Sequence, residues 1–277
     1  MAQRGHLRKM TVALADPVQY TLRLVGQEGE TGVLLNPFIG RSIHLRHTGN
    51  INCVACGRKV KKSFQQGYCF PCMRSLPECD GCIVKPETCH FEAGTCRDEQ
   101  WAQGHCFQPH YVYLANSSGI KVGITRGTQV PTRWIDQGAT QALPIFKVQT
   151  RLQSGLVEVA LKQHIGDRTD WRKMLKGAAD RIDMAARRDE LLACCAEEVS
   201  ALQQRFEGAI EPLTDEAVVD IHFPVTAYPA KVKSFNFDKD PDVKGVLHGI
   251  KGQYLILDGG VINLRKFGGY EVEWRSD

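Results

Sequence analysis

The sequence has no long apolar run and only a mild excess of charge. None of its 277 residues belongs to an apolar stretch approaching the roughly 20 residues that a membrane-spanning helix needs. Residues 1–10 lack the apolar core of a secretory signal peptide. We therefore expect a cytoplasmic protein with no membrane partner. The net charge of +4 permits a nucleic-acid partner without requiring one, since many nearly neutral proteins carry local basic patches.

Regular periodicity is confined to the regions on either side of a stretch that has little of it. Residues 19–24 and 41–46 alternate apolar and polar side chains, which predicts β-strands. Residues 155–165 and 180–206 are expected to be helical, and the second helix is expected to be long and amphipathic. The Cys194–Cys195 pair falls inside this second helix, where we interpret it as packing.

These patterns predict an α+β protein with several small domains, which a chain of 277 residues is long enough to build. Its middle part is dense in Cys, Gly and Pro, so we expect metal, rather than an apolar core, to stabilise it. The expected segments are a β-rich N-terminal module (1–50), a cysteine-rich zinc-binding region (51–110), a domain with a long helix (111–210) and a β-rich C-terminal module (211–277).

Nine of the eleven cysteines lie between Cys53 and Cys106. In a reducing cytoplasm such a group is better explained by metal binding than by disulfides. The first four form two CxxC pairs, Cys53-Val-Ala-Cys56 and Cys69-Phe-Pro-Cys72, separated by twelve residues. This is the spacing of a zinc ribbon, in which four thiolates hold one structural zinc ion in a tetrahedron.

The loop between the two pairs is basic and contains two aromatic residues. We consider two interpretations of it. The loop contacts phosphates while its rings stack on bases, or it is a charged hairpin exposed to solvent. Its candidate nucleic-acid-binding residues are Arg58, Lys59, Lys61 and Lys62.

A second group of cysteines follows and exceeds what one zinc ion requires. Cys79-Asp-Gly-Cys82 is a third pair, and Cys89 and Cys96 are the nearest residues that complete a tetrahedron. Cys106 or His90 could replace one of them, and an iron–sulfur cluster held by four cysteines is an open alternative. We therefore expect two metal ions in the chain, with zinc as the main candidate for both.

Four short motifs follow the cysteines in a fixed order. They are Tyr111-Val-Tyr113, Lys121-Val-Gly-Ile-Thr125, Arg133-Trp134 and a Glu158 on an expected helix. In this order they resemble the GIY-YIG nuclease superfamily, particularly its phage-type members, whose second motif begins with Lys rather than Tyr. Together with the ribbon, the chain resembles a bacterial zinc-ribbon family that carries a GIY-YIG-like domain.

The resemblance implies a small sheet with helices and a role for each motif. Glu158 would be the single protein ligand of a magnesium or other divalent ion, and Arg133 would stabilise the charge that develops on the phosphate. Tyr113 would orient or deprotonate the attacking water. Lys121 would act as a base if burial or a nearby cation lowered its pKa by several units, and would otherwise hold the phosphate.

The same motif residues also have ordinary structural interpretations. Tyr113 fits a core-facing strand position, and Glu158 lies four residues before Lys162, the spacing of a surface ion pair. If the resemblance holds, Tyr113 and Lys121 lie on the same face of a hairpin whose turn is formed by residues 116–119.

Three functions follow from these observations. The first is a metal-dependent nuclease acting on DNA or RNA, with Arg168 and Arg172 extending a basic face beside Glu158. The second is a non-catalytic nucleic-acid-binding or ribosome-associated module that uses the same groove. The third is a zinc-stabilised protein-interaction adaptor, which would expose an apolar patch and no basic groove.

Overall fold

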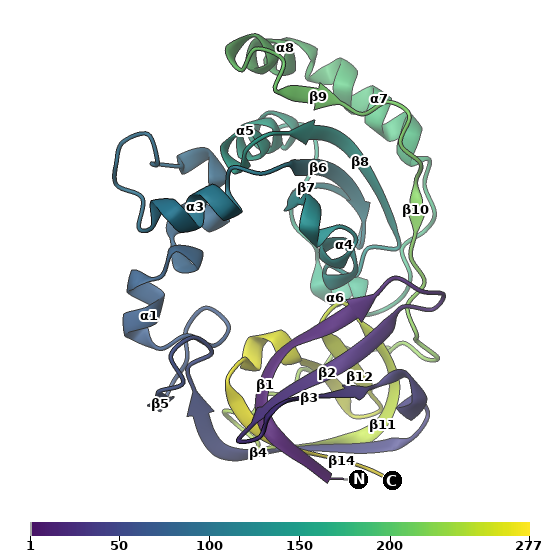
Figure 1. Cartoon of the computed structure of the whole chain (residues 1–277). Helices are drawn as coiled ribbons and strands as arrows, with labels where there is room; N and C mark the ends of the chain where they lie inside the picture. Colours follow the sequence, from purple (N-terminus) through teal and green to yellow (C-terminus); the bar gives the residue numbers. More distant parts are fainter. Residues whose placement is uncertain (1) are drawn as a thin grey trace. The chain divides into compact units, whose positions relative to one another are not determined.

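A computed structural model describes residues 2–277 and shows a mixed α+β protein with two antiparallel sheets. The chain divides into two compact units (Figure 1). Unit 1 contains residues 1–74, 175–177 and 222–277, and unit 2 contains residues 75–174 and 178–221. The cysteine-rich region, expected as one segment, is therefore shared between the two units.

Unit 1 is built on one large antiparallel sheet. Its strand order is β13-β12-β11-β4-β14-β1-β2-β3, and β5 pairs with β4 outside this path. The alternation that predicted a strand over residues 19–24 places Tyr20, Leu22 and Leu24 in the core. The strands are β1 (Ala2–Ala13), β2 (Gln19–Gly26), β3 (Gly29–Leu34), β4 (Ser42–Asn52), β5 (Lys59–Val60), β11 (Asp242–Lys251), β12 (Tyr254–Leu257), β13 (Gly260–Asn263) and β14 (Tyr270–Ser276).

The two β-rich segments, expected as separate modules, share this sheet. β1 pairs with β14, with Gly5 opposite Val272, and β4 lies between β11 and β14. Two 3-10 turns, η1 (Asn36–Phe38) and η5 (Leu264–Phe267), complete the regular structure of these segments. Strands from both ends of the chain therefore bury one common core.

Unit 2 contains a smaller antiparallel sheet of order β10-β8-β6-β7, with β9 pairing beside β8. The helix α4 lies on one face, and α7 and α8 lie on the other (Figure 1). The strands are β6 (His110–Asn116), β7 (Ile120–Arg126), β8 (Gln141–Val148), β9 (Ile210–Pro212) and β10 (Val219–Asp220). The helical elements that surround them are η4 (Gly127–Gln129), α4 (Thr132–Asp136), α5 (Arg151–Leu161), α6 (Trp171–Met174), α7 (Met184–Cys194) and α8 (Ala196–Arg205).

The helix α5 begins at a complete capping box. The Thr150 side chain accepts a hydrogen bond from the backbone N–H of Gln153. The Gln153 side-chain oxygen in turn accepts a hydrogen bond from the backbone N–H of Thr150. Gly155 lets this helix approach the short turn η3 (Pro86–Thr88), because a Cβ at this position would lie 2.6 Å from the Pro86 Cβ. The helix is thus fixed at its start and along one side.

The long helix expected over residues 180–206 is instead two helices, α7 and α8, and this expectation is corrected. The chain leaves helical geometry at Cys195, whose φ is −109° and ψ is 16°. Cys195 is fully buried in an apolar cluster that includes Leu191 and Val199, so both helices turn their apolar faces toward one core. Because the break uses neither Gly nor Pro, the sequence carries no local signal for it.

Short elements connect the cysteines. They are α1 (Phe70–Ser75), η2 (Pro77–Cys79), α2 (Gly81–Val84), η3 and α3 (Glu99–His105). The N-terminus of α3 is capped by Asp98, whose carboxylate accepts a hydrogen bond of 2.8 Å from the Trp101 amide. Within residues 2–277, no helix has the length and apolar character needed to cross a membrane.

Candidate functional site

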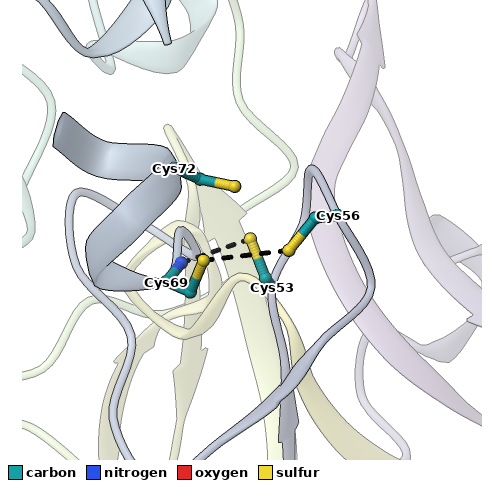
Figure 2. A group of neighbouring side chains, drawn as sticks. All are labelled: Cys53, Cys56, Cys69 and Cys72. Atoms are coloured by element: carbon teal, nitrogen blue, oxygen red, sulfur yellow. Dashed lines mark hydrogen bonds between the residues drawn. The ribbon is translucent and has the colours of Figure 1, made fainter. Parts of the chain in front are cut away.

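Four cysteines meet at one point in unit 1 (Figure 2). Cys53 follows β4, Cys56 lies in the loop after it, Cys69 immediately precedes α1 and Cys72 lies within α1. Their sulfur atoms all lie within 4.8 Å of one another, and those of Cys56 and Cys69 are 3.8 Å apart. Four metal–sulfur bonds of about 2.3 Å in a tetrahedron place the sulfurs about 3.8 Å apart. The donor type and spacing therefore suit a metal ion such as zinc.

The thiols of this group differ in their readiness to ionise. Burial alone would raise the pKa of Cys53, but the backbone N–H groups of Cys56, Cys69 and Ala55 outweigh it and lower the pKa to about 6. The Cys69 amide donates to the Cys53 sulfur at 3.2 Å. A hydrogen bond with the Cys69 thiol raises the pKa of Cys72 to about 12. Metal binding must displace the remaining protons, so metal affinity falls as the pH falls.

A second group of cysteines lies in unit 2. Cys82, Cys89, Cys96 and Cys106 line one small cavity, together with His90. Cys79, which its CxxC spacing with Cys82 predicted as a ligand, is buried at the end of η2 and is not among the residues that line this cavity. Cys106, which the sequence offered as a substitute ligand, does line the cavity.

The expected hairpin is formed by β6 and β7. Tyr113 lies opposite Gly123, and Lys121 lies opposite Ala115, so Tyr113 and Lys121 project from the same face of the sheet. Gly123 leaves room for the phenol, because a Cβ at this position would lie 2.7 Å from the Tyr113 hydroxyl oxygen. The turn falls within residues 116–119, as predicted.

Tyr113 is fully buried, which does not suit direct contact with an attacking water. Its ring packs edge-on against Trp134 at a centroid distance of 6.0 Å, and its hydroxyl oxygen accepts a hydrogen bond of 2.8 Å from Gln137. Burial raises the pKa of Tyr113, although the nearby Arg133 guanidinium opposes this shift. The phenol therefore stays protonated at neutral pH. It lies beside the Arg133 guanidinium and is suited to position it.

Lys121 is 6% exposed on the edge strand β7. Burial lowers the pKa of Lys121 to about 8, and the positive charge of Arg133 acts in the same direction. The carboxylates of Glu158 and Asp167 partly oppose the shift. Asp167 is brought near because the backbone of Val122 donates a hydrogen bond of 2.9 Å to the Gly166 carbonyl. The ammonium group thus titrates close to neutral pH among groups of both signs.

Glu158 lies on α5, which packs against β6 and β7. Its neighbours Val157 and Leu161 enter the apolar cluster, while Glu158 remains partly exposed. Burial raises the pKa of Glu158, and Asp167 raises it further against the opposing charges of Lys162 and Arg133. The ion-pair partner expected from spacing, Lys162, is therefore one of several charges acting on this carboxylate.

The comparison with family models assigns the chain through most of its length. Residues 40–272 match the model described as "Protein of unknown function (DUF2797)". The chain belongs to the DUF2797 family. No curated protein and no solved structure matches it. The family description assigns no chemistry, so the function of this DUF2797 protein must be argued from its residues.

Two residues that the motifs did not single out join the site of the DUF2797 chain. Gln137, at the end of α4, holds the Tyr113 hydroxyl, and Asp167 acts on both Lys121 and Glu158. Within residues 2–277, the buried Gln137 Oε1 and the buried Trp134 Nε1 have no hydrogen-bond partner. In the sequence, Gln137 lies shortly after Arg133, and Asp167 lies shortly after Glu158, each in a short polar stretch. This proximity was the sequence feature that could have pointed to them.

The predicted nucleic-acid-binding residues are exposed in both units of the DUF2797 chain. In unit 1 the Lys62 ammonium lies 5.5 Å from the centroid of the Phe64 ring, and Phe64 packs against Phe70, which is 51% exposed. In unit 2 Arg172 stacks on Trp171 at 4.3 Å. The exposed basic residues are Arg58, Lys59, Lys61 and Lys62 in unit 1, and Arg168 and Arg172 in unit 2.

Proposed function

We propose that this chain is a metal-dependent nuclease whose chemistry is carried out in unit 2 by Lys121, Arg133 and Glu158. The observation that carries the proposal is electrostatic convergence. The pKa of Lys121, on a strand, is shifted by the charges of Arg133 on α4 and Glu158 on α5. Perturbed titratable groups that act on one another in this way are typical of functional sites.

Lys121 is proposed as the general base. Hydrolysis of a phosphodiester requires a water that loses its proton as it attacks phosphorus. A lysine serves this purpose when its pKa lies near the working pH, and burial together with Arg133 lowers the pKa of Lys121 to about 8. Its neutral amine accepts the proton, and the resulting ammonium is balanced by Glu158 and Asp167.

Arg133 is proposed to stabilise the negative charge on the phosphate, using the planar set of donors on its guanidinium. Tyr113 then has a positioning role. Its buried hydroxyl, held by Gln137, lies next to Arg133 and restricts where that side chain can point.

Glu158 is proposed as the protein ligand of a divalent cation such as Mg²⁺. The donor set fits this ion, because burial and the nearby Asp167 carboxylate raise the pKa of Glu158, and a cation would offset this cost of ionising Glu158. When bound, the cation supplies positive charge at the phosphate oxygens. Glu158 holds it on the side of α5, and Asp167 contributes a second negative charge.

A cleavage assay tests this proposal. We expect Mg²⁺-dependent cleavage of DNA or RNA, measured on single- and double-stranded substrates of both kinds, and loss of cleavage in the variant Glu158→Gln. The matched control is Glu216→Gln, which removes an exposed carboxylate from a loop of the same unit. Cleavage that is equal in both variants would show that Glu158 has no part in the reaction.

A second function, nucleic-acid binding without cleavage, is supported by the zinc ribbon of unit 1. Its exposed Phe70 lies beside Phe64, with Arg74 5.8 Å from the Phe70 ring centroid. Exposed rings flanked by cations are typical of surfaces on which bases stack. Binding of oligonucleotides with no cleavage under any divalent cation would favour this function over the nuclease.

A further inference from the structure

The second group of cysteines surrounds a cavity that the proposed nuclease does not use. The cavity has a volume of about 20 Å³ and lies entirely within unit 2. Four thiols line it from separate short segments. Cys82 comes from α2, Cys89 follows η3, Cys96 precedes α3, and Cys106 follows α3. A metal group bound there would link all of these segments.

The spacing of these sulfurs differs from that of the first site. In unit 1, all four sulfurs lie within 4.8 Å of one another. Among Cys82, Cys89, Cys96 and Cys106, all within the described residues, no three sulfurs are that close together. Metal–sulfur bonds of about 2.3 Å leave no room for a water-sized space between the ligands of a single zinc ion. The wider arrangement suits a group of several metal atoms.

The polar residues beside the cavity are engaged by other partners. Asp80 and His90 lie close to Cys82, and these three form a possible ligand set of their own. The Asp80 carboxylate accepts a bond of 2.9 Å from Arg97, and the His90 Nδ1 is paired with the Thr95 hydroxyl at 2.8 Å. Ligation by the four thiols leaves both of these bonds in place.

Positive charge lies next to the same cavity. The backbone of Arg151 donates a hydrogen bond of 2.8 Å to the Cys106 carbonyl, and its guanidinium donates one to the carbonyl of Ile83, which lines the cavity. The Arg151 Nε is buried and has no partner within residues 2–277. An anionic group with sulfur acceptors would both pair with this donor and balance its charge.

We propose that Cys82, Cys89, Cys96 and Cys106 hold an iron–sulfur cluster. Such clusters take four thiolate ligands and spread them over several irons, which matches the wide spacing. The cluster fixes η3 and the start of α5, since η3 packs against Gly155 and Arg151 bonds to Cys106. It thereby stabilises the helix that carries Glu158, and it requires no role in the cleavage reaction.

Metal and sulfide analysis of the full-length chain tests the proposal. After anaerobic purification and incubation with ferric iron, a thiol reductant and sulfide, we expect about two to four irons and as many acid-labile sulfides per chain. A visible sulfide-to-iron charge-transfer absorption should accompany them. The ratio of iron to chain distinguishes a two-iron cluster from a four-iron cluster. Zinc, bound at the first site, should remain at about one per chain.

Two pairs of variants make the assignment specific. Cys89→Ser and Cys106→Ser should lose iron and sulfide while retaining zinc, and Cys56→Ser should lose zinc while retaining iron. Cys194→Ser, at an exposed cysteine, should retain both. A wild-type chain that binds about two zinc ions and no sulfide after this treatment would overturn the proposal, whether or not any variant folds. Retention of the full cluster by Cys106→Ser would equally overturn the ligand set.

Discussion

Within residues 2–277, each unit buries one lysine, and the two lysines differ in what surrounds them. Lys251, at the end of β11 in unit 1, is fully buried, and its ammonium donates a hydrogen bond of 2.9 Å to the Gly177 carbonyl. It also lies over the rings of Phe223 and Tyr228, at 5.5 and 5.3 Å from their centroids. Lys121 in unit 2 is instead surrounded by charged residues.

The pKa of both lysines is nonetheless lowered. Burial lowers the pKa of each to about 8, and for Lys251 burial is the sole cause. A shifted pKa therefore does not distinguish a catalytic group from a structural one in this protein. The distinction comes from the partners. A carbonyl and two rings hold Lys251 in place, whereas charges of both signs make Lys121 able to exchange a proton beside an anion.

The largest effect should come from removing each lysine in turn. We expect Lys121→Met to lower the cleavage rate by about 100-fold or more, because the general base is lost. Lys251→Met should leave the rate per folded molecule unchanged. Single-turnover cleavage of one oligonucleotide by both variants measures the difference. Equal losses in the two variants would remove the distinction between the lysines.

The pH dependence of cleavage sharpens the role of Lys121. A base must be neutral to act, so the rate should rise about tenfold per pH unit at acidic and neutral pH and level off above pH 8. Rate measurements between about pH 6 and 9.5, a range that brackets the pKa, test this. A rate that instead falls as the pH rises through 8 would show that Lys121 acts as a phosphate-binding cation.

Stability should respond to the two substitutions in opposite directions. Lys251→Met leaves the Gly177 carbonyl without its donor, so we expect a loss of about 1–3 kcal/mol in the free energy of unfolding. Lys121→Met removes a buried charge and should leave stability unchanged or higher. Denaturant titrations at pH 7 provide both values. A large loss in Lys121→Met would assign that lysine a structural role as well.

Both lysines should make the folded protein more stable as the pH rises. An unfolded lysine titrates near 10.5, whereas each folded one titrates near 8. Between these values the unfolded chain binds more protons than the folded chain, so stability increases with pH. Each Met substitution should remove part of this increase over the window from pH 8 to 10.5. An unchanged slope in either variant would mean that its lysine is not perturbed.

The smallest effect should come from the basic loop of unit 1. Replacing Lys61 and Lys62 by Gln should weaken nucleic-acid binding and reduce its salt dependence by about one to two released counterions. The cleavage rate at saturating substrate should not change, because these residues lie outside the unit that carries Lys121. Affinity measured at several salt concentrations separates the loop's contribution. An affinity that does not change would show a loop that is only solvated.

Sequence patterns predicted the features that depend on local spacing. The group of four cysteines in unit 1 and the hairpin around residues 116–119 follow from CxxC pairs and turn residues. Sequence patterns failed where the position of a side chain depends on segments that are distant in the sequence. Whether Cys79 or Cys106 lines the cavity depends on how several short segments fold around it. No spacing rule contains that information.

The same limit explains Tyr113. Its alternation along the strand fitted both a core position and a catalytic one, and the structure combines a buried ring with a polar contact at its hydroxyl. The contact comes from Gln137 on α4, a residue 24 positions away. The burial of Tyr113 next to Arg133 depends on the tertiary structure. The motif therefore indicated which residues lie near each other, but not the role of Tyr113.

The strand order of unit 1 has a consequence for how the protein is made. During synthesis β4 leaves the ribosome long before β11 and β14, which pair with most of its length, exist. Unit 2 lies between them in the sequence, and its sheet can pair from strands already present. The nascent chain therefore carries open strand edges on β1 and β4 while unit 2 folds, and such edges are prone to pair with other chains. Ribosome-bound chains that end before β11 should depend on chaperones that shield strand edges.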